Sequence, residues 1–542
     1  MIRTDIVRLY KTVHTWTGIT CGFGLFIAFY AGALMMFQEP IARWASPPAV
    51  GVAAVSLDDA PRLLELVAAA HPEAQEEGIT LHLQGHENEP ARVTWEEDAP
   101  HQEGKGRWHK HVHWWATLKP DGTLLARQEE PSELTAFIDS IHRRAGIPGP
   151  WGSYFMGTVS LLYGVALIAG VFVLLPTLVK DFLALRIGHN LKRMWLDVHH
   201  VVGMTALPFH LVIAVTATGW GFFGPLLSAQ EHVIYGGRQK SVMARDAERW
   251  RVPGPTGEVG AMLPPAQLLQ RLNAQVSGFE PAAMTFTNFG DKAAAVKVAG
   301  AEHGYVGDTR FGGVILSAVT GTLIKDNRAS HQDPDRRAGT VILALHTGEY
   351  GGITITWAYF FLGFSGAWLF YTGNLLWIET RRKRARQGSE VEQPRSARLL
   401  GSATVGVCLG CVAGLSLTIV AAKWLHGRVA DLNHWHGVIY YAVFLACIAW
   451  AFARGAARAA VHLLWLCAAA TLAIPLTSLA ALLFPALGLW AHGSAAAIGV
   501  DVVACIGALC FAWMARATAR RVQHGPADSV WSARSARAVV AS

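Results

Sequence analysis

The sequence Asp197-Val-His-His-Val-Val-Gly-Met-Thr-Ala-Leu-Pro-Phe-His210 opens an apolar run that continues to Trp220. A run of this length can cross a bilayer, yet it contains His199, His200 and His210, and ionisable residues inside a membrane span mark functional sites. If the run is one straight helix, His199 and His210 share a face, because eleven residues at about 100° each end roughly 20° past three full turns. His200 lies off that face. Imidazoles stacked on one face of an apolar helix are what a membrane cytochrome needs to ligate haem iron at two depths.

Composition places this chain among membrane proteins. Of its 542 residues, 52% are hydrophobic and only 16% are charged, values that suit a membrane protein with some mass in water. The net charge of +7 comes from Lys and Arg that collect at every second loop, so it indicates topology rather than binding to nucleic acid. We therefore expect a multi-pass protein in contact with lipid, with both termini in the cytoplasm and both large loops on the outer side of the membrane.

The apolar runs predict an all-α membrane bundle of about eight transmembrane helices, with two small α/β domains inserted between them. In chain order we expect a first helix at 1–38, a first outer domain at 39–142, a second helix at 143–180, a third helix at 195–224, a second outer domain at 225–340, a fourth helix at 341–378, a basic cytoplasmic loop at 379–400, four further helices at 401–516 and a cytoplasmic tail at 517–542. In each outer block, a helix pattern precedes short alternating runs typical of strands.

Histidines recur at matching places in the two halves of this arrangement. The first and third spans both begin with His-x-x-x-Gly, at His14 and His199. The second and fourth spans both follow an aliphatic residue, a histidine and a Gly-rich turn, with the histidines at His142 and His346. This symmetry indicates duplication of a helix–domain–helix unit.

With these two outer domains and four histidines beside the spans, the chain resembles the iron-regulated PepSY-associated transmembrane family, in particular its inner-membrane ferric-siderophore reductases with two haems. The resemblance covers about residues 1–385 and leaves the last four spans without an assigned role. It implies a multi-pass protein of the bacterial inner (cytoplasmic) membrane whose two large outer domains are periplasmic. It also implies two haem b cofactors and an enzyme that reduces a ferric siderophore in the periplasm. The electron donor would be a partner on the cytoplasmic side or a quinol.

Haem iron that is ligated by two neutral imidazoles has no open position, so it passes electrons and does not bind oxygen. We expect His14 and His199 to flank one haem at the cytoplasmic edge, and His142 and His346 to flank a second at the outer edge. His210 is the alternative outer ligand. No catalytic residue is assigned. Close approach of a macrocycle or a helix is expected at four glycines, which are Gly18, Gly22, Gly203 and Gly363.

Other histidines support weaker hypotheses. His109, His111 and His113 alternate on a predicted strand and could bind a metal, although an exposed polar face is the simpler interpretation. His426, His434 and His436 could contact the substrate or anchor the chain at the membrane interface, and we favour the second interpretation. No nucleotide-binding glycine motif follows a strand. Two other functions remain open: a regulatory or binding protein that carries PepSY domains, and a siderophore or iron transporter without redox activity.

Overall fold

A computed structural model describes residues 3–48, 55–83, 93–98, 111–129, 132–178, 186, 191–236, 248, 251–306, 312–387, 394–526 and 529–533. The chain divides into two compact units. We call residues 1–47, 132–226 and 351–542 the helical unit, and residues 48–131 and 227–350 the sheet unit. Each unit has a hydrophobic core of its own.

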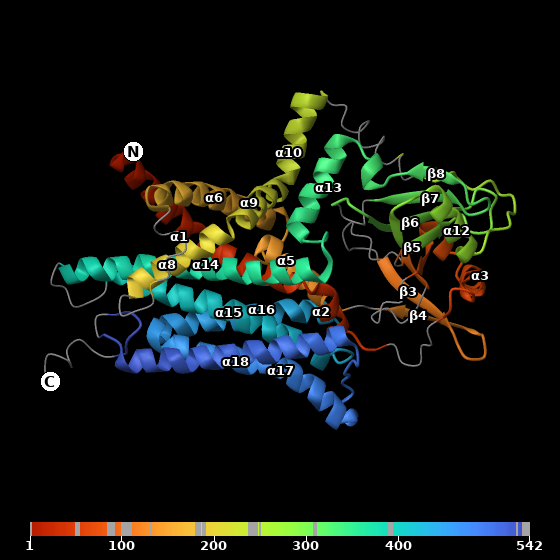
Figure 1. Ribbon diagram of the computed structural model, residues 1–542. Helices are drawn as coiled ribbons and strands as arrows, with labels where there is room; N and C mark the ends of the chain where they lie inside the picture. The colour runs from red at the N-terminus through yellow and green to blue at the C-terminus, as the bar shows by residue number, and fades with distance from the viewer. Residues whose placement is uncertain are drawn as a thin grey trace. The chain divides into compact units, whose positions relative to one another are not determined.

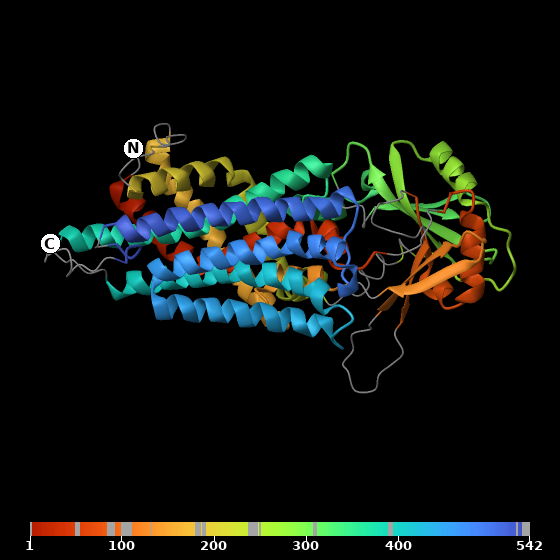
Figure 2. The same ribbon diagram turned by 90° about the horizontal axis from the view of Figure 1, so that it is seen from below.

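The helical unit consists of helices that are mostly apolar (Figures 1 and 2). In chain order they are α1 (Thr4–Met35), α2 (Gln38–Ala45), α5 (Leu134–Arg144), α6 (Pro150–Leu174), η1 (Leu175–Thr177), α8 (Leu191–Thr205), α9 (Leu207–Gly221), α14 (Gly352–Gln387), α15 (Arg395–Leu425), α16 (Leu432–Arg454), α17 (Ala456–Leu483), η5 (Pro485–Leu487) and α18 (Ala495–His524). Helix α10 (Phe223–Gln230) contains a boundary between the units.

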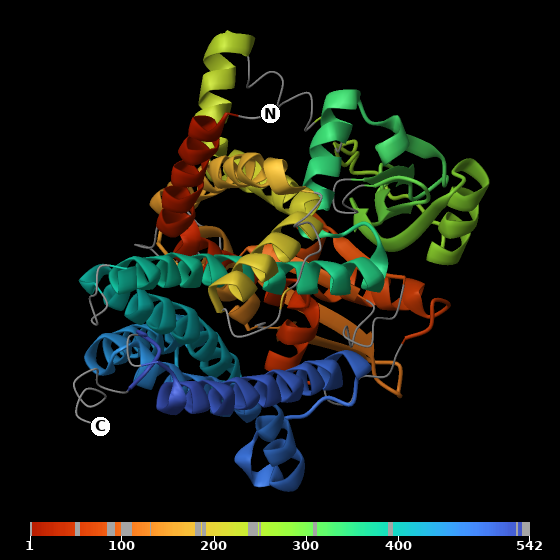
Figure 3. The same cartoon turned by 60° about the vertical axis from the view of Figure 1, so that its left-hand side comes forward.

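Among the described residues, seven helices are long and apolar enough to cross a membrane, namely α1, α6, α14, α15, α16, α17 and α18. The prediction of a multi-pass membrane protein is confirmed at this level. The last four of these helices lie side by side, coloured from teal to blue in Figure 3.

The third predicted span is a bent pair of helices. Helix α8 ends at Thr205, α9 begins at Leu207, and the pair is bent by 70°. Pro208 in the first turn of α9 explains the break, because proline has no N–H to donate and its ring clashes with the carbonyl four residues earlier. The prediction that His199 and His210 share one face of a straight helix is therefore wrong. The described residues provide eight spans only if this pair counts as one.

The sheet unit contains one antiparallel sheet of eight strands, in the order β4-β3-β2-β1-β5-β6-β7-β8 (Figure 1). Its elements are α3 (Ala60–Ala70), α4 (Ala74–Glu77), β1 (Ile79–His82), β2 (Val93–Asp98), β3 (His111–Leu118), β4 (Leu124–Glu129), η2 (Glu231–Tyr235), α12 (Pro265–Gln275), β5 (Phe279–Thr287), β6 (Ala295–Glu302), β7 (Gly313–Ser317), β8 (Leu323–Asp326), η4 (Ala329–His331) and α13 (Pro334–Thr347). Each half of the sheet is thus a four-strand meander that follows a helix, α3 or α12.

The two predicted outer domains share this sheet instead of forming separate domains. Strands β1 and β5 pair antiparallel, with Ile79 opposite Phe286 and Leu81 opposite Met284. All four side chains are buried in one core. A four-strand meander alone would leave β1 and β5 as edges with unpaired backbone groups, and their pairing removes both edges. The sequence pattern predicts the strands but contains no information about which edges meet.

Two stretches belong to a different unit from the predicted one. Residues 132–142, predicted as the end of the first outer domain, lie in the helical unit and form most of α5. Residues 341–347, predicted as the beginning of the fourth span, are the end of α13 in the sheet unit. Both are short helices with one apolar side, and such a pattern predicts neither a strand nor a full span.

Acid should loosen one loop of the sheet unit. The carboxylate of Asp291 accepts hydrogen bonds from the backbone N–H groups of Ala293, Thr256 and Gly257 and from the Thr256 hydroxyl. These bonds, the one from Ala293 first, lower the pKa of Asp291 to about 2. Because the folded pKa lies below the unfolded value, this stabilisation is present above about pH 4 and is lost as the pH falls towards 2.

The expected result is a pH-dependent difference in backbone hydrogen exchange at Thr256 and Gly257 between the native chain and Asp291→Asn. The native chain should be the better protected at about pH 6, and the difference should vanish as the pH approaches about 2. Mass spectrometry of peptides that cover this loop, corrected for intrinsic exchange rates, measures it. An equal difference at every pH would contradict the role of the Asp291 charge.

Candidate functional site

His14 on α1 and His199 on α8 lie face to edge in the helical unit. Their ring centroids are 6.1 Å apart and the ring planes make an angle of 79°. An imidazole nitrogen binds a metal at about 2.0–2.1 Å, so two axial nitrogens are about 4 Å apart, and their ring centres roughly 6 Å apart. The observed spacing therefore suits two imidazoles on opposite sides of one metal ion.

Both rings present the same nitrogen for coordination. His14 Nδ1 lies 2.8 Å from the carbonyl oxygen of Ala166, which can only accept, so Nδ1 carries the proton. His199 Nδ1 lies 3.1 Å from Thr372 Oγ1. The Thr372 hydroxyl donates to the carbonyl of Leu369 at 2.9 Å, so its oxygen accepts from His199. In each ring Nε2 then keeps its lone pair, which is the usual arrangement for a metal-bound histidine whose other nitrogen is held by the protein.

An ion cluster fixes the beginning of the helix that carries His199. Asp197 is 1% exposed and its Oδ2 accepts from both the backbone N–H and the Nε of Arg186, each at 3.0 Å. Its Oδ1 lies 3.0 Å from Nε of Arg193. A buried carboxylate held by two guanidinium groups is costly to disrupt, so this cluster ties Arg186 to α8 two residues before His199.

Small residues that the sequence analysis did not single out lie against these rings. A Cβ at Gly170 of α6 would be 3.0 Å from the His14 ring, and one at Gly373 of α14 would be 3.8 Å from the His199 ring. Of the four glycines that were singled out, Gly363 allows α14 to approach α1 closely, because a Cβ there would be 3.0 Å from that of Ala33. A Cβ at Gly18 would meet nothing within 4 Å among the described residues.

His142 near the end of α5 is directed at α1. Its Nδ1 lies 2.7 Å from the carbonyl oxygen of Ala28, so this nitrogen carries the proton and Nε2 keeps a lone pair. The ring lies against Gly32, where a Cβ would be 2.8 Å from it. His142 therefore has the same tautomer as His14 and His199.

His346 lies in the last turn of α13, which ends at Gly348 in the left-handed region with a φ of +74°. This helix belongs to the sheet unit, whereas His142 belongs to the helical unit. The pairing of His142 with His346 stays a prediction.

His210 on α9 is fully buried, and its ring has no hydrogen bond to the described residues. It is 0% exposed, and neither ring nitrogen has a hydrogen-bond partner among the described residues. The rings of Phe29, Tyr163 and Phe209 surround it, with centroids 5.5–6.1 Å away. A buried polar group normally has a partner, so this imidazole is suited to a ligand or an internal water. The hypothesis that His210 is a ligand therefore rests on its burial and its unpaired ring nitrogens within the described chain. It no longer rests on a face shared with His199.

His436 on α16 has the same character and was interpreted differently from the sequence. It is 0% exposed, and both ring nitrogens lack partners in the described part of the chain. The interpretation of His436 as an interfacial anchor is therefore wrong.

The sheet unit has a group of side chains that could bind a metal, but at a different place from the predicted His109, His111 and His113. Atoms of His71, Glu73 and Glu97 lie within 4.8 Å of one another, and His71 Nδ1 is 3.3 Å from a Glu73 oxygen. Simple ion pairs account for this group. His109 and the side chain of His111 lie outside the described residues, and His113 forms an exposed ion pair with Glu96.

The fold and this histidine arrangement define a multi-pass membrane protein with paired imidazoles between its helices. The chain belongs to the family described as PepSY-associated TM region, which matches residues 11–380. It is also similar to the Uncharacterized protein PA4219 of Pseudomonas aeruginosa, with 27% identity over 296 residues, or 51% of this chain and 71% of that protein. The family match ends before α15, so α15–α18 are additional to it.

Proposed function

We propose that this protein transfers electrons across a membrane through two bis-histidine haem b groups and reduces ferric siderophores on the outer side. The single observation that carries the proposal is the pair of His14 and His199, with ring centroids 6.1 Å apart and both Nδ1 atoms hydrogen-bonded. Two neutral imidazoles from different helices are the ligand set of an electron-transfer haem.

The residues around this pair have separate tasks. Bound haem would supply an iron that changes between Fe(III) and Fe(II). His14 and His199 would hold the iron through Nε2, and the Ala166 carbonyl and Thr372 hydroxyl keep the proton on Nδ1 and orient the rings. Gly170 leaves room beside the His14 ring.

A second centre would take the electron outward. His142 with His346 is the first candidate set, and His210 is the alternative ligand. The acceptor, by resemblance to the reductases of this family, is a ferric siderophore. One-electron reduction converts hard Fe(III) into Fe(II), which oxygen-rich chelators hold more weakly, so iron is released. The donor is a cytoplasmic-side protein or a membrane quinol.

The proposal is tested by the spectrum of the purified full-length protein. Reduction with dithionite should give b-type haem bands, and chemical assay should give about two haems per chain. In liposomes loaded with reductant, ferric complexes of hydroxamate, catecholate and carboxylate siderophores should release Fe(II) to an external ferrous chelator. Protein without haem would overturn the proposal and leave the regulatory and transport functions.

A further inference from the structure

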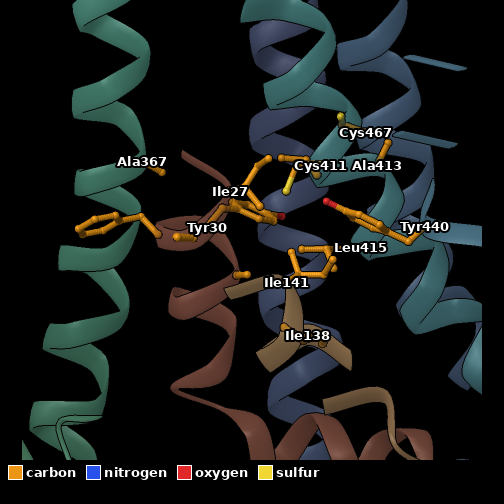
Figure 4. Close-up of a cluster of buried hydrophobic side chains, with 14 of the residues drawn as sticks. Ile27, Tyr30, Ile138, Ile141, Ala367, Cys411, Ala413, Leu415, Tyr440 and Cys467 are labelled. Atoms are coloured by element: carbon orange, nitrogen blue, oxygen red, sulfur yellow. The ribbon is translucent and has the colours of Figure 1, made fainter. Parts of the chain in front are cut away.

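The C-terminal helices α15–α18 pack against the short helix that carries His142. Leu134, Ile138 and Ile141 form one face of α5 and are all 0% exposed. Figure 4 shows Ile138 and Ile141 beside Leu415 of α15, with Tyr440 of α16 on one side and Tyr30 of α1 on the other. These residues belong to one continuous core. Helix α5 is therefore held between α1 and the C-terminal helices.

Helix α16 contacts α5 along a defined stripe. The ring of Phe137 on α5 lies 6.3 Å from that of His436 and 5.6 Å from that of Tyr440, measured between centroids. His436 and Tyr440 are four residues apart, so they lie one turn apart on the same face of α16. Both are buried. The stripe fixes how α5 is rotated about its axis.

A hydrogen bond locks the end of the same helix. The Tyr441 hydroxyl donates to the carbonyl oxygen of Gly146 at 2.6 Å, just after α5 ends. Gly146 has a φ of +73°, a backbone conformation that favours glycine. A Cβ at this position would collide with the Tyr441 hydroxyl oxygen. Tyr441 therefore sets the position of the turn that follows His142 by four residues.

The C-terminal helices also hold α2, the last helix before the chain leaves the helical unit at residue 47. Trp44 of α2 donates through Nε1 to Asp501 at 2.9 Å and to Ser478 at 3.0 Å. Lys423 Nζ lies 3.6 Å from the centre of the Trp44 ring. The places where the chain first leaves this unit and first returns to it are thus both anchored on α15–α18.

We propose that α15–α18 act as a positioning scaffold, which holds α5 through Tyr441 and the stripe of His436 and Tyr440 and thereby aims His142 at the haem iron. The haem part of this inference rests on the proposed function. On one side α5 is fixed by α16, and on the other His142 reaches α1 through the Ala28 carbonyl. A shift of α5 by one residue would turn the His142 side chain by about 100° around the helix axis. A metal ligand must be held within about 0.5 Å of its productive position, so such a shift would remove His142 from its site. Tyr441 is a positioning residue in this proposal and is not a ligand.

The test compares Tyr441→Phe with Tyr154→Phe. The first removes the hydrogen bond to Gly146 and keeps the ring. The second removes a hydroxyl of α6 for which the described residues offer no hydrogen-bond partner. In full-length protein, Tyr441→Phe should raise hydrogen exchange of peptides covering residues 134–146 by roughly two- to tenfold, the effect of losing one hydrogen bond. Tyr154→Phe should not change exchange in these peptides.

A second readout addresses the ligand itself. Tyr441→Phe should shift the midpoint potential and the low-spin electron paramagnetic resonance signal of one haem, the one lost in His142→Ala, and leave the other haem unchanged. Gly146→Ala should do the same more strongly. Unchanged exchange in α5 would overturn the scaffold. Faster exchange with both haem signals unchanged would overturn the link to His142, while a chain without haem would sink only the proposed function, because the exchange experiment needs no cofactor.

Discussion

Purified His14→Ala and His199→Ala proteins should each contain about half the haem of the native protein, because each would lose one of the two proposed bis-imidazole centres. The centroids of the two rings are 6.1 Å apart, so removal of either ring would leave a haem bound between them with one protein ligand. The remaining haem should keep its midpoint potential. The measurement is the haem-to-protein ratio together with a redox titration that resolves two components. Electron transfer across a liposome membrane should fall to background in both variants.

The control is His200→Ala, which removes a neighbouring imidazole about 100° away around the helix from His199. It should retain both haems and both potentials. Added imidazole should restore part of the missing haem in His14→Ala, because the small side chain leaves room beside Gly170 for a free ligand. Full haem loading in both His14→Ala and His199→Ala would show that these residues are not ligands.

The sequence predicted the closeness of His14 and His199 better than it predicted the helix between His199 and His210, while their role as haem ligands stays a prediction. The pairing followed from two copies of one local pattern, His-x-x-x-Gly at the start of a span, which holds whatever the path of the chain further on. The common face followed from adding eleven residues along a straight helix. Pro208 lies within that interval, and the bend of 70° at this point makes the addition invalid.

Long-range packing explains most of the remaining differences. The strands of the sheet unit are visible as local alternation, but the pairing of Ile79 with Phe286 depends on two edges that are far apart in the sequence. Thr372, which accepts from His199, is an ordinary helix residue in the sequence. Its role exists only because α14 places it beside α8. Such contacts cannot be predicted from composition or periodicity.

Single substitutions of His142, His346 and His210 should identify the ligands of the proposed outer haem. If His142 and His346 are the ligands, His142→Ala and His346→Ala should each remove the same half of the haem, identified by its midpoint potential, and that half should differ from the one lost in His14→Ala. The Ala28 carbonyl holds the proton of His142 on Nδ1, which is the tautomer of a histidine that ligates metal through Nε2. Retention of both haems in His142→Ala would exclude it.

His210→Leu separates the alternatives by opposite effects. If His210 is a ligand, the variant should lose about half of the haem. A variant of the second ligand of that haem should lose the same half. If it is only a packing residue, both haems should remain and the protein should become more stable. The stabilisation should be about 1–3 kcal/mol, because leucine removes two buried nitrogens that have no hydrogen-bond partner within the described chain. Haem content and thermal unfolding in detergent measure the two effects on the same sample. A variant that keeps both haems and is clearly less stable would contradict both alternatives, since it would mean that the His210 ring is hydrogen-bonded in the folded protein.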